Sequence, residues 1–425
     1  MNKYSKKIKT LIDHNFYKES EINYDEHEII QLIKNTFQTV YLLEQQYHLI
    51  KSINILKSND YSNHPLIYSA IVDLYNSKLI EFDIDPNNFN VFVDWFRKKI
   101  KTINLKKIFK NTKYYDIFFN PIHEKKILFD ILYSNIFISL DSIHHIECED
   151  LIYEHYGFDN INVHIYNLKN DHFKINIDLI FKIINFFRLF FKSKKHLDIY
   201  CILGKQKKYI SNSEYLCSDN INSGLCAYDK YIMIWRKEEF YKVLIHELCH
   251  YYHVDYHVDD KIYNHFKHII NIKCELFTDS VNESFNESIA LIIHSSIYSV
   301  IHNLSFTYIF NYEMLFTKFQ ISKIINHMKM EYLSDILIKP VKQTTSVISY
   351  YIVKYLFIIN MPILLDYLKD NGFVAENKNK FVELYKNILT EKNIKSVDLS
   401  LQIKLLDKPN NKFIYKTLCM AMFQL

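Results

Sequence analysis

The stretch "VLIHELCHYYHVD", residues 243–255, decides how this 425-residue chain is interpreted, because it contains the pattern HExxH. The preceding residues, "KEEFYK" (237–242), carry acids where the first turn of a helix favours them. On a helix, His246 and His250 lie on one face, one turn apart, and can bind the same zinc ion. Glu247 lies beside them, where a carboxylate can act as the general base that takes a proton from water.

The residues around this pattern favour a buried metal site over a helix that happens to carry surface histidines. Residues 243–245 are apolar, and both inner positions of the pattern are uncharged. Cys249 occupies one of them and is expected to be a small apolar filler that faces away from the metal. His253 and His257 lie too far along the helix axis to share the ion, so we expect them behind the ligands or at the surface.

Acidic residues that could complete the site follow in "VNESFNESIALII" (281–293), where Asn286, Glu287 and Ala290 form the pattern NExxA. Together with HExxH, this pattern resembles the gluzincin class of zinc metallopeptidases, in which a second helix supplies a glutamate ligand from such a motif. The resemblance implies Glu287 as the third zinc ligand.

Other acids remain as alternatives to Glu287. Glu283 lies one turn earlier on the same helical face, and Asp255 lies five residues after His250. One of these acids, or Asp279, can instead accept the second ring N–H of a ligating histidine. A solvated acidic face is the simpler explanation of residues 279–287, but it does not account for acids inside an otherwise apolar run.

A longer similarity covers about the central third of the chain. The segments "INSGLCAYDKYIMIWRKEEFYKVLIHELCHYYHVD" (221–255), "ESFNESIA" (283–290) and "SYYIVKYLFIIN" (349–360) resemble the zinc metalloproteinases of large nucleocytoplasmic DNA viruses. The resemblance implies a zinc-dependent peptidase of viral origin and leaves its substrate open. Because the viral proteins carry a similar tyrosine pair, it also implies Tyr351, or its neighbour Tyr350, as the donor that stabilises an oxyanion. Core packing is the alternative for either tyrosine in a chain with 34 of them.

The remaining sequence predicts an α+β fold that is mostly helical. Residues 1–195 are expected to form a helical N-terminal region of unknown role, with apolar residues at helical spacing in 27–57 and 179–195. Residues 196–425 are expected to form a zincin-like domain with a small mixed sheet and the HExxH helix. Its strands are predicted at 196–203 and 231–236. A peptide substrate is expected to add to the edge of residues 231–235, although these residues also suit a core strand.

Charge and cysteine content exclude several other classes. The net charge of +4 is mild and the basic residues form no long stripe, which argues against a nucleic-acid partner. Seven cysteines without a CxxC pair indicate reduced thiols, and the first residues lack the apolar core of a signal peptide. The most apolar stretches, 177–191 and 350–365, contain Lys or Arg and are expected to be buried helices and not membrane spans. We therefore expect a cytoplasmic protein, in the host cytoplasm or the virion if viral, that is not secreted.

Together these features predict a zinc-dependent endopeptidase or peptidase that acts on a protein or peptide substrate, with Glu247 as general base. The alternative is a catalytically inactive zincin-like scaffold or interaction protein. The presence of Glu247 argues against that alternative, because loss of the base is the simplest route to inactivity. A purely structural zinc site is also less consistent with the sequence, since such sites prefer four closed ligands, often cysteines.

Overall fold

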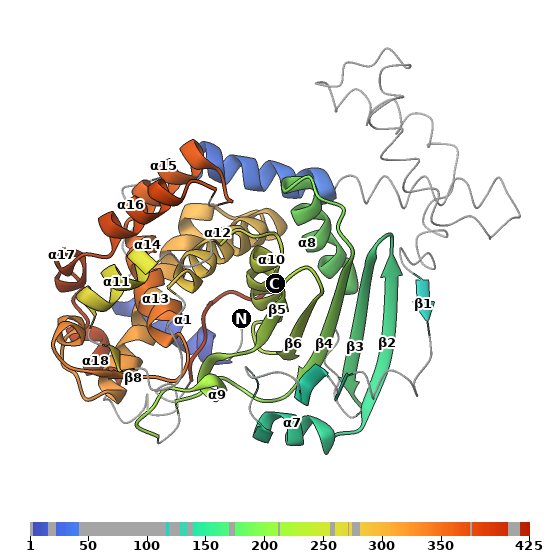
Figure 1. The fold of residues 1–425 in the computed structure, drawn as a ribbon, viewed down its shortest axis with the longest axis horizontal. Helices are drawn as coiled ribbons and strands as arrows, with labels where there is room; N and C mark the ends of the chain where they lie inside the picture. Colours follow the sequence, from blue (N-terminus) through green and yellow to red (C-terminus); the bar gives the residue numbers. More distant parts are fainter. Residues whose placement is uncertain are drawn as a thin grey trace, which may run out of the picture.

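A mixed sheet and a larger body of helices pack against each other in an α+β fold (Figure 1). The computed structural model describes residues 3–15, 23–41, 116–118, 128–129, 131–133, 138, 140–169, 175–210, 213–255, 260–270, 272–273, 281–374, 376–406 and 417–425. Residues 42–57 of the predicted helix at 27–57 lie outside these ranges, whereas residues 28–41 are helical.

The main sheet contains six described strands: β1 (Asp116–Phe118), β2 (Leu151–Phe158), β3 (Ile161–Leu168), β4 (Leu197–Gly204), β5 (Gly224–Ala227) and β6 (Tyr231–Arg236). Their order across the sheet is β1-β2-β3-β4-β6-β5. Strands β2 and β3 form an antiparallel hairpin, β3, β4 and β6 run parallel, and β5 returns antiparallel to β6. A separate parallel pair is formed by β7 (Ile272–Lys273) and β8 (Val341–Lys342). The strands predicted at 196–203 and 231–236 are confirmed as β4 and β6.

The β2–β3 hairpin corrects the prediction that residues 1–195 form a helical region. Two runs rich in β-branched and aromatic residues are joined at Asp159 and Asn160, and Asp159 adopts the left-handed conformation with φ 51°. Strand β3 then pairs with β4, with Val163 opposite Ile199. The sheet is therefore continuous across the boundary predicted near residue 195.

The helices cover the sheet and continue beyond it. They are α1 (Lys3–Asn15), α7 (Leu140–Glu147), α8 (Ile177–Phe190), α9 (Ser218–Ile221), α10 (Phe240–Tyr251), α11 (Asp260–Ile269), α12 (Glu283–His302), α13 (Phe306–His327), α14 (Lys354–Ile359), α15 (Met361–Asn371), α16 (Lys378–Ile388), α17 (Glu391–Lys395) and α18 (Ser400–Leu406). Residues 28–41 are helical as well. The described chain also has a short 3₁₀ helix, η3 (Leu333–Leu337), and a π-helical turn, η4 (Ser349–Val353).

One large hydrophobic core joins the sheet to α8, α10 and α12, and a smaller cluster lies between the other face of the sheet and α7. Helix α10 is buried along its whole length, and α12 lies beside it (Figure 1). Helix α10 begins at Phe240, so Glu238 and Glu239 precede it and do not lie in its first turn as predicted. Two buried helices side by side provide a rigid base for polar side chains that face each other.

Residues 417–423, which we call the strap, pass through the core beside these helices. The backbone N–H groups of Met420 and Ala421 donate to the buried carboxylate of Glu239, at 2.7 and 2.6 Å. Those of Met422 and Phe423 donate to the buried carboxylate of Glu313, at 2.8–2.9 Å. The strap is therefore fixed at two consecutive points, and the two buried carboxylates obtain hydrogen-bond donors from its backbone.

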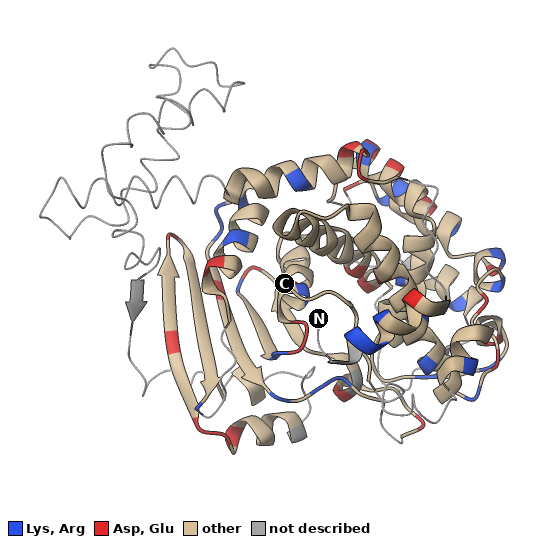
Figure 2. Cartoon of the chain, turned by 180° about the vertical axis from the view of Figure 1, so that it is seen from behind, with Lys and Arg blue, Asp and Glu red and all other residues tan. Residues whose placement is uncertain are grey.

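Charged side chains of both signs are mixed over the described elements (Figure 2). Among the described residues, no single helix combines the length and apolar character needed to cross a membrane. The pair formed by 349–359 and 361–371 meets the length and composition criteria only jointly, and it is bent by 87°.

Candidate metal centre

Helix α10 carries both histidines of the HExxH pattern on one buried face. The ring centroids of His246 and His250 lie 4.8 Å apart, and their Nε2 atoms are 3.1 Å apart. Both side chains are more than nine-tenths buried. This arrangement follows directly from a spacing of four residues on a helix, and it brings two potential metal ligands to one point.

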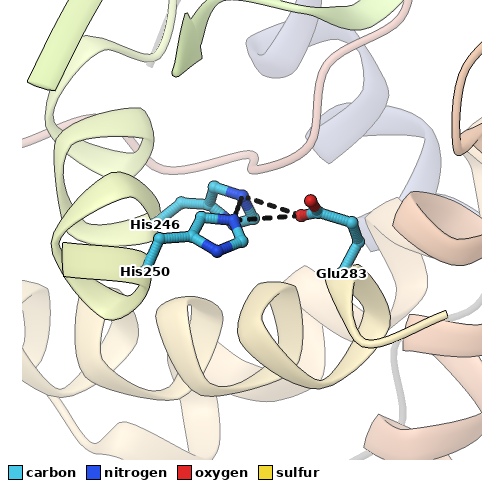
Figure 3. Close-up of side chains that lie close together, drawn as sticks. All are labelled: His246, His250 and Glu283. Carbon is cyan, nitrogen blue, oxygen red and sulfur yellow. Dashed lines mark hydrogen bonds and ion pairs between the residues drawn. The ribbon is translucent and has the colours of Figure 1, made fainter. Parts of the chain in front are cut away.

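A carboxylate from the start of α12 meets the two imidazoles at this point (Figure 3). Oε2 of Glu283 lies 3.1 Å from Nε2 of His250 and 3.3 Å from Nε2 of His246. Three atoms bound to one zinc ion at about 2.0–2.1 Å in tetrahedral geometry lie about 3.3 Å from one another. The three side chains thus form a group of metal-ligating type whose spacing fits one ion.

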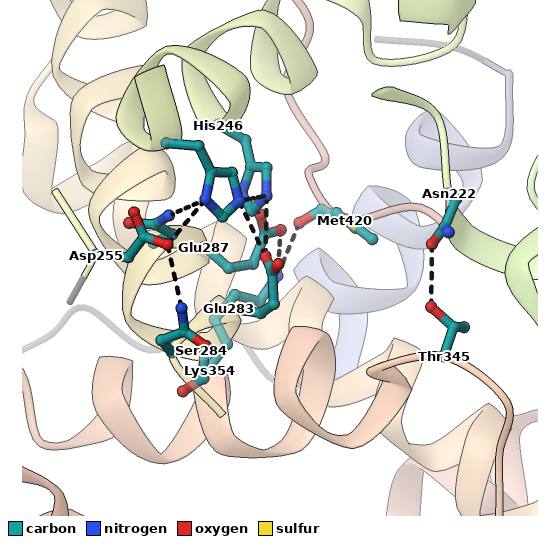
Figure 4. Close-up of polar contacts among 12 residues, drawn as sticks. Asn222, His246, Asp255, Glu283, Ser284, Glu287, Thr345, Lys354 and Met420 are labelled. Atoms are coloured by element: carbon teal, nitrogen blue, oxygen red, sulfur yellow. Dashed lines mark hydrogen bonds and ion pairs between the residues drawn. The ribbon is translucent and has the colours of Figure 1, made fainter. Parts of the chain in front are cut away.

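The second nitrogen of each imidazole faces a different acid. Nδ1 of His246 lies 2.8 Å from Oε2 of Glu287, and Nδ1 of His250 lies 3.0 Å from Oδ2 of Asp255 (Figure 4). An ionised carboxylate only accepts hydrogen bonds, so each Nδ1 can donate to the acid beside it when it carries the ring proton. The side-chain nitrogen of Asn286 also lies 2.8 Å from Nδ1 of His250. With the protons on Nδ1, both Nε2 atoms direct lone pairs toward Glu283, and a cation between the three atoms would remove their mutual repulsion.

The electrostatics of the cluster show the same need for positive charge. Burial alone would lower the pKa of His250, but the carboxylates of Glu283 and Asp255 outweigh it and raise this pKa well above its ordinary value. Burial would raise the pKa of Glu283, yet the two histidines lower it. Protons on the imidazoles or a bound divalent cation would both satisfy the carboxylate. The donor set of two imidazoles and one carboxylate is one that zinc accepts in catalytic sites.

Glu287, the third ligand implied by the resemblance, occupies a different position. Its carboxylate is fully buried and lies between two lysines: Oε1 contacts Nζ of Lys242 and is 3.6 Å from Nζ of Lys354. Burial opposes ionisation of Glu287, but both lysines hold its pKa well below the usual range. Of the two ring nitrogens of His246, Glu287 contacts Nδ1 and not the Nε2 atom that faces Glu283. The geometry therefore favours Glu283, the alternative one turn earlier, over Glu287 as the third ligand.

Asp255 is not placed as a metal ligand either, because its carboxylate contacts Nδ1 of His250 and not the Nε2 atom that faces Glu283. It accepts further hydrogen bonds from Tyr228 at 3.0 Å and Asn282 at 3.1 Å. His253 lies beyond the end of α10, with φ 55°, and faces Asp229 at the surface. His257 and Asp279 lie outside the described residues. Cys249 is fully buried, as expected of an apolar filler.

Glu247 lies beside the histidines in a cleft between α10 and β5. Burial raises the pKa of Glu247 to about 7, against the opposing effect of His246 and His250. Gly224 is packed so closely that a Cβ there would lie 2.7 Å from Oε1 of Glu247 and 2.7 Å from Cγ1 of Val243. The strand thus approaches the carboxylate as near as a bare backbone allows.

The strand at the cleft is β5 and not the predicted segment 231–235. That segment forms most of β6, which pairs with β4 on one side and with β5 on the other. Strand β5 ends the described sheet on this side, next to α10. The prediction that a peptide adds to the edge of residues 231–235 is therefore wrong, because four residues of β5 already occupy that edge. The alternative, that these residues form a core strand, is confirmed.

Of the two predicted tyrosines, the structure brings Tyr350 to the metal cluster. Its ring centroid is 6.0 Å from that of His246, and it lies close enough to Glu283 for the two groups to interact. Burial, with the nearby carboxylates, raises the pKa of Tyr350 well above its ordinary value. Tyr351 is fully buried in the core, and its hydroxyl has no hydrogen-bond partner among the described residues. The π-helical turn η4, a form often found at functional sites, holds the pair.

Several neighbours of the cluster were not anticipated from the sequence. These are Tyr228, whose hydroxyl lies 3.3 Å from Nδ1 of His250, the lysines 242 and 354, and Gly224. Gly224 had a usable signal, because the chain contains only four glycines and this one lies shortly before HExxH. The other three carry no local pattern. No family model, curated protein or solved structure matches the chain.

Proposed function

We propose that the chain is a zinc-dependent peptidase whose metal is held by His246, His250 and Glu283. The observation that carries this proposal is the mutual spacing of Nε2, Nε2 and Oε2 at 3.1–3.3 Å, which equals the edge of a zinc coordination tetrahedron. Three protein ligands leave one position open, as in catalytic zinc sites and unlike closed structural ones. When bound, zinc polarises a carbonyl group and lowers the pKa of water.

The residues around the ligands supply the remaining parts of a hydrolytic site. Glu247 lies in the cleft beside the cluster and has its pKa near neutrality, so it takes a proton from the attacking water and passes it to the leaving amine. Tyr350 lines the same cleft and can donate its hydroxyl hydrogen to the developing oxyanion. Glu287 and Asp255 fix the orientation of the two imidazoles.

A peptide substrate fits this arrangement because β5 lies at the end of the described sheet next to the cleft. An extended peptide can add to its outer side through backbone hydrogen bonds, as in other cases of strand addition. This would place a substrate carbonyl over α10, near Glu247. A peptidase is therefore favoured over a hydrolase of small esters or amides, which would not need a strand at the cleft.

Metal analysis and hydrolysis of a denatured protein substrate together test the proposal. We expect about one zinc ion per chain, lost in His246→Ala and retained in Glu247→Gln, with hydrolysis abolished in both. Glu376→Gln, an exposed residue away from the site, serves as the matched control and should keep both properties. Purified protein without zinc, or with unchanged hydrolysis in Glu247→Gln, would overturn the proposal. Zinc binding without any hydrolysis in the unmodified protein would favour the scaffold alternative.

A further inference from the structure

The cleft beside the metal cluster is small. Its volume is about 30 Å³, enough for one or two water molecules, whereas pockets for drug-sized ligands have roughly 300–1,000 Å³. It extends from His246 and Glu247 toward Lys242, which lies one turn earlier on α10. A substrate side chain next to the reacting carbonyl would have to enter this space.

One wall of the cleft comes from the strap. Met420 lines it together with Lys242 and Val243 from α10. The sulfur of Met420 lies 3.7 Å from Nζ of Lys242, and its carbonyl oxygen accepts a hydrogen bond from Lys354 at 3.2 Å. Figure 4 shows Met420 reaching the side of the cluster that carries Glu287. Met420 therefore closes the cleft from a segment far along the chain, 178 residues after Lys242.

The strap as a whole cannot shift away from the cleft. The backbone of Met420 is held by Glu239, and Leu418 of the strap donates to the carbonyl oxygen of Lys208 at 3.1 Å. Lys208 in turn pairs with Glu239 at 2.9 Å, and both side chains are buried. Shifting the strap would leave the Glu239 carboxylate and its donors without partners inside the protein, which is costly. The side chain of Met420 is the part of the wall that a substitution can remove without this cost.

We infer that Met420 determines which side chains the site accepts, and that the substrate class consists of peptides with Gly, Ala or Ser next to the scissile bond. This inference rests on the proposed peptidase function and concerns the same site. A methyl or hydroxymethyl group fits the available space, while a branched or aromatic side chain would collide with Met420. Met420 is thus a specificity-determining residue, supplied by the strap and not by the helices that hold the metal.

Two zinc-binding hydroxamates test the inference without turnover. The zinc-loaded full chain is titrated with acetohydroxamate, which is small, and with 4-methylpentanohydroxamate, which carries a leucine-like group. We expect the unmodified protein to bind the bulky compound no better than the small one. We expect Met420→Ala to bind the bulky compound about tenfold more tightly than the unmodified protein does, the usual range for a hydrophobic pocket that gains space. Acetohydroxamate should bind both proteins equally.

Peptide hydrolysis provides the second measurement. Peptides that differ only in Ala or Leu next to the scissile bond should differ by about tenfold or more in kcat/KM, in favour of Ala, and Met420→Ala should remove this preference. Met420→Leu, which keeps the volume of the wall, should retain it. Met422→Ala is the matched control: this strap residue is buried in another cluster and does not line the cleft, so it should lower stability without changing the preference.

The outcomes separate this inference from the proposed function. A preference for the bulky hydroxamate or the Leu peptide in the unmodified, zinc-containing protein would overturn the inference and leave the peptidase proposal intact. The same applies if Met420→Ala keeps its zinc but leaves both preferences unchanged. Absence of zinc from the unmodified protein would instead overturn the proposed function, and this inference with it.

Discussion

Two glutamates one turn apart on α12 occupy different electrostatic environments. Glu283 faces two imidazoles and is partly exposed, whereas Glu287 is fully buried between Lys242 and Lys354. The negative charge of Glu287 is already balanced by two ammonium groups, which disfavours metal binding by this carboxylate. Its other oxygen can still accept the N–H of His246. The lysines thus favour a role for Glu287 in orienting His246, a proposed ligand, over binding the metal itself.

Substituting the two glutamates separately should distinguish these roles. We expect Glu283→Gln to abolish stoichiometric zinc binding, because it removes a charged ligand. Glu287→Gln should weaken zinc binding by about 10- to 100-fold, the usual effect of losing a carboxylate behind a ligating histidine. It should also lower the free energy of unfolding by about 3–5 kcal/mol, because two buried lysines lose their partner. Zinc titration and urea unfolding measure both effects; equal zinc affinities in the two variants would show that the roles are wrongly assigned.

The tyrosine pair allows a similar comparison. We expect Tyr350→Phe to lower kcat by about 10²–10³-fold, the range for loss of one oxyanion donor, with zinc content unchanged. Tyr351→Phe should leave kcat unchanged and should not destabilise the fold, because the lost hydroxyl has no partner among the described residues. Steady-state kinetics on both variants provide the measurement. A larger loss in Tyr351→Phe than in Tyr350→Phe would restore the sequence-based preference for Tyr351.

At the scale of single residues, the sequence predicts those neighbours that are set by spacing along one helix. His246, Glu247 and His250 follow from a helix with a four-residue repeat, and the structure places them as expected. The choice between Glu283 and Glu287 does not follow, because four residues separate them and both lie on the same face of α12. It depends on Lys354, which is 67 positions beyond Glu287 in the sequence. No local pattern encodes that contact.

At the scale of secondary-structure elements, the distance between β5 and α10 controls the cleft. Gly224 permits the strand to lie against Glu247, and its neighbours in β5 pair with β6. The sequence indicated a strand near the cleft but assigned it to residues 231–235, which directly precede the helix. A strand of only four residues, preceded by a polar loop, gives too little alternation to be recognised.

Adding one methyl group to this strand should therefore disturb the site. We expect Gly224→Ala to lower kcat/KM by about 100-fold, since a displacement of about 1 Å of a catalytic group can have this effect. Zinc content should persist because the three atoms nearest to a Cβ at position 224 belong to Glu247 and Val243 and not to the proposed ligands. Gly372→Ala is the control: its φ of 75° makes the substitution strained, but nothing lies within 4 Å, so stability should fall by about 1 kcal/mol with activity intact. Full activity in Gly224→Ala would show that the close approach is not needed.

At the scale of the whole molecule, segments far apart in sequence are fixed by single buried or half-buried carboxylates. Asp25 accepts from the backbone N–H groups of Phe306 and Thr307 at 2.8 and 3.0 Å and from the hydroxyl of Ser305 at 2.5 Å. It thereby links residues 23–25 to the N-terminus of α13, where a negative charge is favoured. Glu239 and Glu313 hold the strap in the same way.

The Asp25 link gives the fold a definite acid dependence. Burial alone would raise the pKa of Asp25, but hydrogen bonds from Ser305, Thr307 and Phe306 lower it to about 2, below the ordinary value of 3.8. Because the folded pKa is depressed, the stabilisation is complete above pH 3.8 and is lost as the pH falls through about 2. We expect Asp25→Asn to be less stable by about 1 kcal/mol at pH 7, and we expect this difference to shrink as the pH falls through about 2. Urea unfolding at several pH values checks this; a difference that does not depend on pH would contradict it.

Long-range organisation was the least predictable part of the fold. The α+β class and strands β4 and β6 follow from composition and alternation. The β2–β3 hairpin was missed although Asp159-Asn160 between two alternating runs is a turn signal. Its pairing with β4 extends the sheet across the predicted boundary near residue 195, and that register depends on contacts between strands separated by α8. Such pairings are set by the whole core and not by any one segment.

The strap also has a consequence for how the protein is made. The three proposed metal ligands all lie between positions 246 and 283, whereas the wall of the cleft includes position 420. During synthesis on the ribosome, well over 100 residues must be added after Glu283 before Met420 emerges. A growing chain can thus assemble its ligands long before its cleft is closed. Selectivity for small side chains would arise only after residue 420 has been added, so a growing chain that binds zinc before that point would discriminate less between side chains.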